Sequence, residues 1–92
     1  MKAYKLIATP DKWTQNEMAR DAKGESCDPN HPDAVAFCLS GACQVAYPNR
    51  SERIKIREKI GIAIGGERAT RWNDHPDRTH AEVVALLRKL DI

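Results

Sequence analysis

Three cysteines and three histidines are the residues of this 92-residue chain best suited to bond-making chemistry. One arrangement is a cysteine hydrolase, in which Cys38 is the nucleophile, His80 or His75 is the base, and Asn73 or Asp74 orients the imidazole. A reactive thiolate is usually favoured by a helix N-terminus or an adjacent cation. The helix expected to carry Cys38 begins about six residues earlier, so this thiol would lie beyond the reach of the dipole. We therefore expect Cys38 to be a buried core residue, and catalysis is the less favoured interpretation.

A metal site would have to use the same residue types, namely Cys27, Cys38, Cys43, His31, His75 and His80. Their spacing does not favour one, because no C-x-x-C or H-x-x-x-H pair is present. Cys38 and Cys43 would also lie about 140° apart around a helix, which does not suit chelation of one ion. No glycine-rich phosphate loop occurs either. We expect no metal and no cofactor.

The segment "RWNDHPDRTHAEVV", residues 71–84, gathers many polar side chains, and local structure explains several of them. Thr79 and Glu82 form a T-x-x-E capping box, which satisfies free amides at the start of a helix. His80 then occupies the exposed first position of that helix. Residues 76–77 favour a turn, and Trp72 is expected to be an apolar anchor beneath the helix.

Asn73 and Asp74 remain open to two interpretations. They precede a His-Pro bond, where short polar side chains commonly bond back to the backbone. The alternative is that one of them faces a ligand. In that case the ligand-binding surface would lie where Trp13 and Gln15, the central helix and the loop from Trp72 to Asp74 converge.

Three to four helices are predicted to position these residues, and three segments fit more than one structure. Residues 3–8 favour a short helix over a strand, and residues 13–27 fit a helix or a hairpin with its bend at Asp21 to Gly24 equally well. The stretch "HPDAVAFCLSGACQVAYP" predicts a central helix over 33–46, apolar nearly all round, starting after Pro32. Its Ser40, Gly41 and Ala42 would let another backbone approach closely.

The second half of the chain predicts two further helices. Ser51 suits the N-cap of the first, with Ile56 and Ile60 at helical spacing before a stop at Gly65 and Gly66. Residues 60–64 also alternate with period two, so a strand there is the competing reading. The last helix follows the capping box, with Val83, Leu86, Leu87 and Leu90 on one face.

Charge and composition limit the classes of partner and the cellular compartment that the chain suits. The net charge is +2, but residues 50–89 contain ten Lys or Arg against six Asp or Glu. The basic segment 50–59 permits weak nucleic-acid binding, although it lacks the interleaved aromatic residues of single-strand binders. The odd cysteine count and the lack of a signal peptide or membrane span indicate an intracellular, cytoplasmic chain with reduced thiols.

The segments "WTQNEMARDAKG", "FCLSGA" and "WNDHPDRTHAEVVALL" occur here in the order seen in a family of small uncharacterised bacterial and phage proteins, which the chain resembles from about Leu6 to Leu90. A glycine typically follows the tryptophan-threonine-glutamine element in that family, whereas Asn16 stands there here, and asparagine also suits a left-handed backbone. The resemblance implies one domain and a bacterial or phage setting without a known activity. The residues it points to are Trp13, Gln15, Cys38, Gly41, Ala42, Trp72, Asn73, Asp74 and Glu82.

Taken together, the sequence predicts one domain over residues 1–92, mainly α, with a bundle of three to four helices and an optional N-terminal β-hairpin. The favoured function is a non-catalytic binding or interaction module for a small polar ligand or a protein, including a second copy of the chain. Its candidate ligand-binding residues are Trp13, Gln15, Trp72, Asn73 and Asp74. The Cys38 hydrolase and a nucleic-acid binder acting through residues 50–59 are the alternatives, and no membrane partner is expected.

Overall fold

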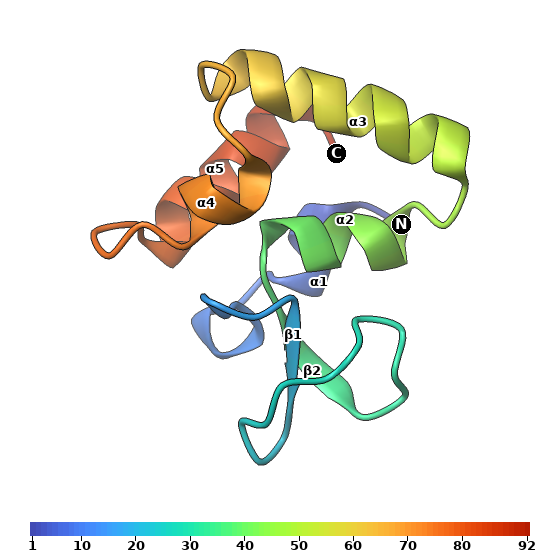
Figure 1. Ribbon diagram of the computed structural model, residues 1–92, viewed down its shortest axis with the longest axis vertical. Coiled ribbons are helices and arrows are strands. Elements are labelled where there is room, and N and C mark those ends of the chain that lie inside the picture. The colour runs from blue at the N-terminus through green and yellow to red at the C-terminus, as the bar shows by residue number, and fades with distance from the viewer.

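The computed structural model describes residues 1–92 and contains five α-helices, one 3-10 turn and two short strands. The predicted mainly α fold with a small β-hairpin is confirmed. In chain order the elements are α1 (Ala3–Leu6), η1 (Pro10–Lys12), β1 (Ala19–Asp21), β2 (Ala34–Phe37), α2 (Leu39–Ala46), α3 (Arg50–Ala63), α4 (Ala69–Asn73) and α5 (His80–Leu90). Figure 1 shows α3 crossing one end of the molecule and the two strands at the other, with α2 between them.

The N-terminal segment forms the expected short helix, and Ala3 and Ile7 are fully buried. Residues 13–27 are neither a continuous helix nor a simple hairpin. The bend at Asp21 to Gly24 is present, since the Asp21 carboxylate accepts from the backbone N–H of Lys23 and Glu25, and Gly24 has a φ of 81°. The strand before this bend pairs mainly with a segment farther along the chain.

That partner corrects the predicted helix over 33–46. β1 pairs antiparallel with β2, with Ala19 opposite Phe37, so residues 34–37 are a strand and the helix α2 begins only at Leu39. The first half of the segment therefore does not form the expected helical face, and Val35 is 46% exposed. An apolar run fits a strand and a buried helix equally well, and the strand forms here because residues 19–21 supply its backbone partners.

The α3 helix begins two residues before the predicted position. Asn49, not Ser51, is the N-cap, and its side-chain oxygen accepts from Glu52 N at 3.2 Å. The alternative strand at 60–64 is wrong, since the helix continues to Ala63 and ends before Gly65 and Gly66, both of which have positive φ. Only two of its residues, Ile56 and Ile60, are buried.

The α5 helix has the predicted capping box, with both reciprocal hydrogen bonds between Thr79 and Glu82. Its Val83 and Leu87 are fully buried in the core. The short helix α4 was not predicted, because its five residues lack an apolar repeat long enough to be detected.

The core lies where α1, α2 and α5 meet, with α3 and the strands packed around it. Its buried members are Ala3, Ile7, Ala19, Phe37, Leu39, Ala42, Cys43, Ile56, Ile60, Val83, Leu87 and Ile92. All three cysteines are free thiols. No helix of the fold combines the length and the apolar character needed to cross a membrane.

Candidate functional site

A buried asparagine joins three distant parts of the chain. The side chain of Asn73, at the end of α4, is completely shielded from solvent. Its Oδ1 accepts from Trp13 Nε1 at 2.7 Å and from Leu39 N, the first amide of α2, at 3.0 Å. Its Nδ2 donates to Thr14 O at 3.1 Å and to Asp74 Oδ1 at 2.9 Å. All the hydrogen-bonding capacity of this amide is therefore used, and three of its four bonds hold the N-terminal segment and α2 against α4.

Two neighbouring residues extend this cluster. Gln15 Nε2 donates to the carbonyl oxygens of Asn73 at 3.0 Å and His75 at 2.9 Å, and Asn16 N donates to Asp74 Oδ1 at 2.8 Å. Asn16 has a φ of 70°, the left-handed conformation that the sequence indicated at this position. The bonds of Asn73 and Asp74 thus run mostly to residues about sixty positions away, and local turn chemistry alone does not account for them.

The structure brings four of the five candidate ligand-binding residues, Trp13, Gln15, Asn73 and Asp74, into this one cluster. The fifth, Trp72, takes no part in it with its side chain. The guanidinium of Arg78 lies 3.8 Å from the centre of the Trp72 ring, and Arg78 Nε donates to Trp72 O at 2.9 Å. Arg78 also pairs with Glu82 at 2.9 Å, so Trp72 is tied to the start of α5.

The position of Cys38 differs from the expected one. This residue is the N-cap of α2 and not a mid-helix residue, and its Sγ accepts from Gly41 N at 3.3 Å. The thiol therefore lies at the helix N-terminus, and the expectation that it would lie beyond the reach of the dipole is wrong. Cys38 is nevertheless only 2% exposed, and burial raises the pKa of its thiol although the Gly41 and Ser40 amides oppose that shift.

The histidines have other partners. His80 Nε2 lies 2.6 Å from Ile7 O, so this residue is half-buried at the first position of α5 and not exposed as expected. His75 Nδ1 accepts from Asp77 N at 3.1 Å. No hydrogen bond joins either imidazole to Cys38, and no three His, Cys, Asp or Glu side chains are grouped to hold a metal ion. Burial raises the pKa of Cys43 to about 12.

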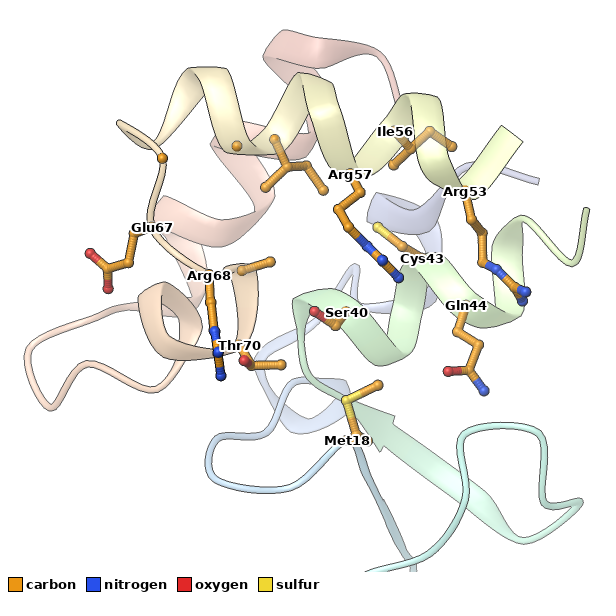
Figure 2. A pocket seen from close by; sticks show the side chains of 14 residues that line it. Met18, Ser40, Cys43, Gln44, Arg53, Ile56, Arg57, Glu67, Arg68 and Thr70 are labelled. Atoms are coloured by element: carbon orange, nitrogen blue, oxygen red, sulfur yellow. The ribbon is translucent and has the colours of Figure 1, made fainter. Parts of the chain in front are cut away.

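A cleft of about 750 Å³ opens between α2, α3 and α4. Apolar side chains contribute to its wall, among them Ile56 and Ile60 of α3 and Ala69 of α4. In Figure 2, Arg57 extends from α3 into the space above α2, between Arg68 on one side and Arg53 on the other. The volume of the cleft lies within the range of about 300–1,000 Å³ that is usual for small-molecule sites.

The polar lining of the cleft is rich in hydrogen-bond donors. The side chains of Arg53, Arg57 and Arg68 make no ion pair or hydrogen bond within the protein, and the only carboxylate in the lining is Glu67. The remaining polar lining groups are the hydroxyls of Ser40 and Thr70 and the amide of Gln44. Positive charge thus gathers on the walls of a concave site.

This cleft was not among the sites predicted from the sequence. The run containing Arg53 and Arg57 was recognised as basic but was considered only as a weak nucleic-acid-binding segment. Their spacing of four residues was the available signal, since it places both on one side of a helix. Arg68 carried no such signal, because its position beside them depends on the turn at Gly65 and Gly66 and on the packing of α4.

The cluster of Trp13, Gln15, Asn73 and Asp74, called here the asparagine cluster, lies beside the cleft. Met18 and Thr70 line the cleft and also an adjoining hollow of about 210 Å³, which Cys38 and Asp74 reach. A Cβ on Gly41 would lie 2.1 Å from Met18 O, so the close backbone approach expected at this glycine is confirmed. The spacing between α2 and the β1 side of the cleft therefore depends on a residue of the "FCLSGA" motif.

One family model matches residues 1–90, which include every helix and strand described above. The chain belongs to the DUF6197 family, a family of unknown function. The resemblance to an uncharacterised family is thereby confirmed. No curated protein and no solved structure matches the chain. DUF6197 has no assigned activity, so the geometry of the cleft is the basis for proposing a function.

Proposed function

We propose that this chain is a non-catalytic, single-domain binding module that takes up an anionic ligand in the cleft between α2, α3 and α4. The observation that supports this proposal is the set of three arginines, Arg53, Arg57 and Arg68, on the walls of one concave site without acidic partners in the protein. Arginine side chains placed together raise one another's electrostatic energy, and a bound anion relieves that repulsion.

The proposal assigns the asparagine cluster a positioning role. Hydrogen bonds of this cluster join the segment 13–16 and the first amide of α2 to the end of α4. We propose that they fix α4 against the start of α2. α4 carries Arg68 next to its first residue and Thr70 within it. The family motifs would then contribute to binding by holding the cleft open, whereas the arginines contact the ligand.

Calorimetric titration of the protein with small anions at low salt tests the proposal. The panel contains citrate, succinate, inorganic phosphate and inorganic pyrophosphate. At least one should bind, and Arg57→Gln should weaken its affinity by about tenfold, as expected for the loss of one charge-assisted hydrogen bond. Arg50→Gln is the matched control, because Arg50 is an exposed arginine of the same helix that does not line the cleft.

Two results would contradict the proposal. The first is that no anion of the panel binds. The second is that Arg50→Gln weakens binding as much as Arg57→Gln, which would mean that the anions respond to overall charge and not to the cleft.

A further inference from the structure

The chemistry of the cleft narrows the class of its ligand, on the assumption that the proposed anion-binding function holds. The charged groups are three arginines against one carboxylate, Glu67. A monocarboxylate would leave most of this positive charge unmatched. A phosphate group carries up to two negative charges on three free oxygens, and arginine binds such oxygens in pairs.

Neutral donors accompany the arginines. The Ser40 hydroxyl of α2 and the Thr70 hydroxyl of α4 both line the cleft, on two different walls. Figure 2 shows Thr70 beside Arg68, with Ser40 below Arg57. Hydroxyl donors interleaved with arginines suit a tetrahedral oxyanion, because its oxygens point in several directions and each can accept more than one hydrogen bond.

The rest of the lining indicates that the ligand is more than a bare anion. Met18, Cys43, Ile56, Ile60 and Ala69 supply apolar surface in the same cleft. The volume of about 750 Å³ far exceeds the needs of inorganic phosphate and suits a molecule of drug or nucleotide size. Apolar contacts would then hold an uncharged moiety while the arginines hold its phosphate.

The cleft lacks features expected of a site for single-stranded nucleic acid. None of its fourteen lining residues is aromatic. Proteins that bind single strands usually stack successive bases on aromatic side chains along a groove. We infer that the ligand is a small phosphorylated molecule with a partly apolar moiety, of about the size of a mononucleotide.

The test uses the full chain and four probes: ADP, inorganic pyrophosphate, succinate and a single-stranded oligonucleotide of mixed sequence. Calorimetry should give binding of ADP and pyrophosphate at one shared site, with ADP about tenfold tighter than pyrophosphate because of its apolar moiety. Succinate should bind at least tenfold more weakly than pyrophosphate. The oligonucleotide should not compete with ADP.

Variants of the neutral donors separate phosphate recognition from simple charge attraction. Ser40→Ala should weaken pyrophosphate and ADP binding severalfold and leave succinate binding unchanged. Ser51→Ala is the matched control, since Ser51 is an exposed helical serine outside the cleft, and should change none of the affinities. Circular dichroism of both variants establishes that the fold is retained.

The outcomes distinguish this inference from the proposed function. If succinate binds as tightly as pyrophosphate, and Arg57→Gln weakens both, the cleft is an anion site but the phosphate inference is overturned. If the oligonucleotide binds and displaces ADP, or binds while ADP does not, a polymer is the ligand and the inference is overturned. If none of the four probes binds, the inference is overturned, and the anion-binding proposal fails with it only if citrate and inorganic phosphate do not bind either.

Discussion

The substitution Asn73→Ala should strongly destabilise the protein. The asparagine side chain makes four hydrogen bonds, to Trp13, Thr14, Leu39 and Asp74, and is fully buried. Alanine would remove all of them and leave the Leu39 amide without an acceptor in a buried position.

The size of the effect follows from these bonds. An unsatisfied buried amide costs about 1–3 kcal/mol, and each of the partly buried bonds to Trp13 and Thr14 contributes about 0.5–1.5 kcal/mol. The free energy of unfolding should therefore fall by about 2–6 kcal/mol, a large share of the roughly 5–15 kcal/mol typical of a folded domain.

Urea unfolding followed by circular dichroism measures this loss. Asn30→Ala is the matched control, since Asn30 is exposed and its side chain makes no hydrogen bond, and the change should stay within about 0.5 kcal/mol. If Asn73→Ala unfolds the chain altogether, Trp13→Phe tests the same network, because it removes the Nε1 bond to Asn73 Oδ1 while an aromatic ring still packs against the core. The lost bond and the smaller ring should together cost about 1–3 kcal/mol. A loss below about 1 kcal/mol in Asn73→Ala, with an unchanged urea slope, would refute the reasoning.

Three further predictions concern other parts of the fold. Gly41→Ala should lower the free energy of unfolding by about 1–3 kcal/mol, because the added Cβ would meet Met18 O. Gly61→Ala should raise the free energy of unfolding by about 0.5–1 kcal/mol, because open space surrounds this helical glycine. Urea unfolding of both variants measures the two changes. A thiol-reactive probe at neutral pH should label the half-buried Cys27 first and Cys38 only on unfolding, so rapid labelling of a Cys27→Ser variant would contradict the assigned burial. Hydrogen bonds from the Thr79 backbone and hydroxyl lower the pKa of Glu82, so its contribution to stability is present above the unfolded value of about 4.5 and is lost as the pH falls through the lower folded value. Glu82→Gln should therefore reduce the acid dependence of unfolding in that range, and an unchanged pH profile would count against the assignment.

Local signals in the sequence predicted some elements and not others. The capping box of Thr79 and Glu82 and the glycine stop at 65–66 are formed by residues close together in the chain, so the start of α5 and the end of α3 could be predicted from them. The strand β2 could not, because its formation depends on pairing with β1 across a long loop. For the same reason Cys38 was expected inside a helix over 33–46, whereas it is the N-cap of a helix that begins at Leu39.

The candidate site likewise has a part that could be predicted from the sequence and a part that could not. The grouping of Trp13, Gln15, Asn73 and Asp74 could be proposed from residue types and from the family resemblance, although their partners could not. The cleft was beyond sequence reasoning because Arg68 reaches it from a helix that no periodicity indicates. Sites assembled from separate elements by tertiary packing leave little trace in any single segment.

The small number of buried residues in α3 has a consequence for how the cleft works. Only Ile56 and Ile60 of its fourteen residues are buried, whereas α4 is bonded to α2 through Asn73 and α2 lies in the core. Its backbone amides should therefore exchange with deuterium through openings that leave α2 and α5 folded. A ligand would then enter and leave the cleft when α3 moves away, while α2 and α4 keep their positions.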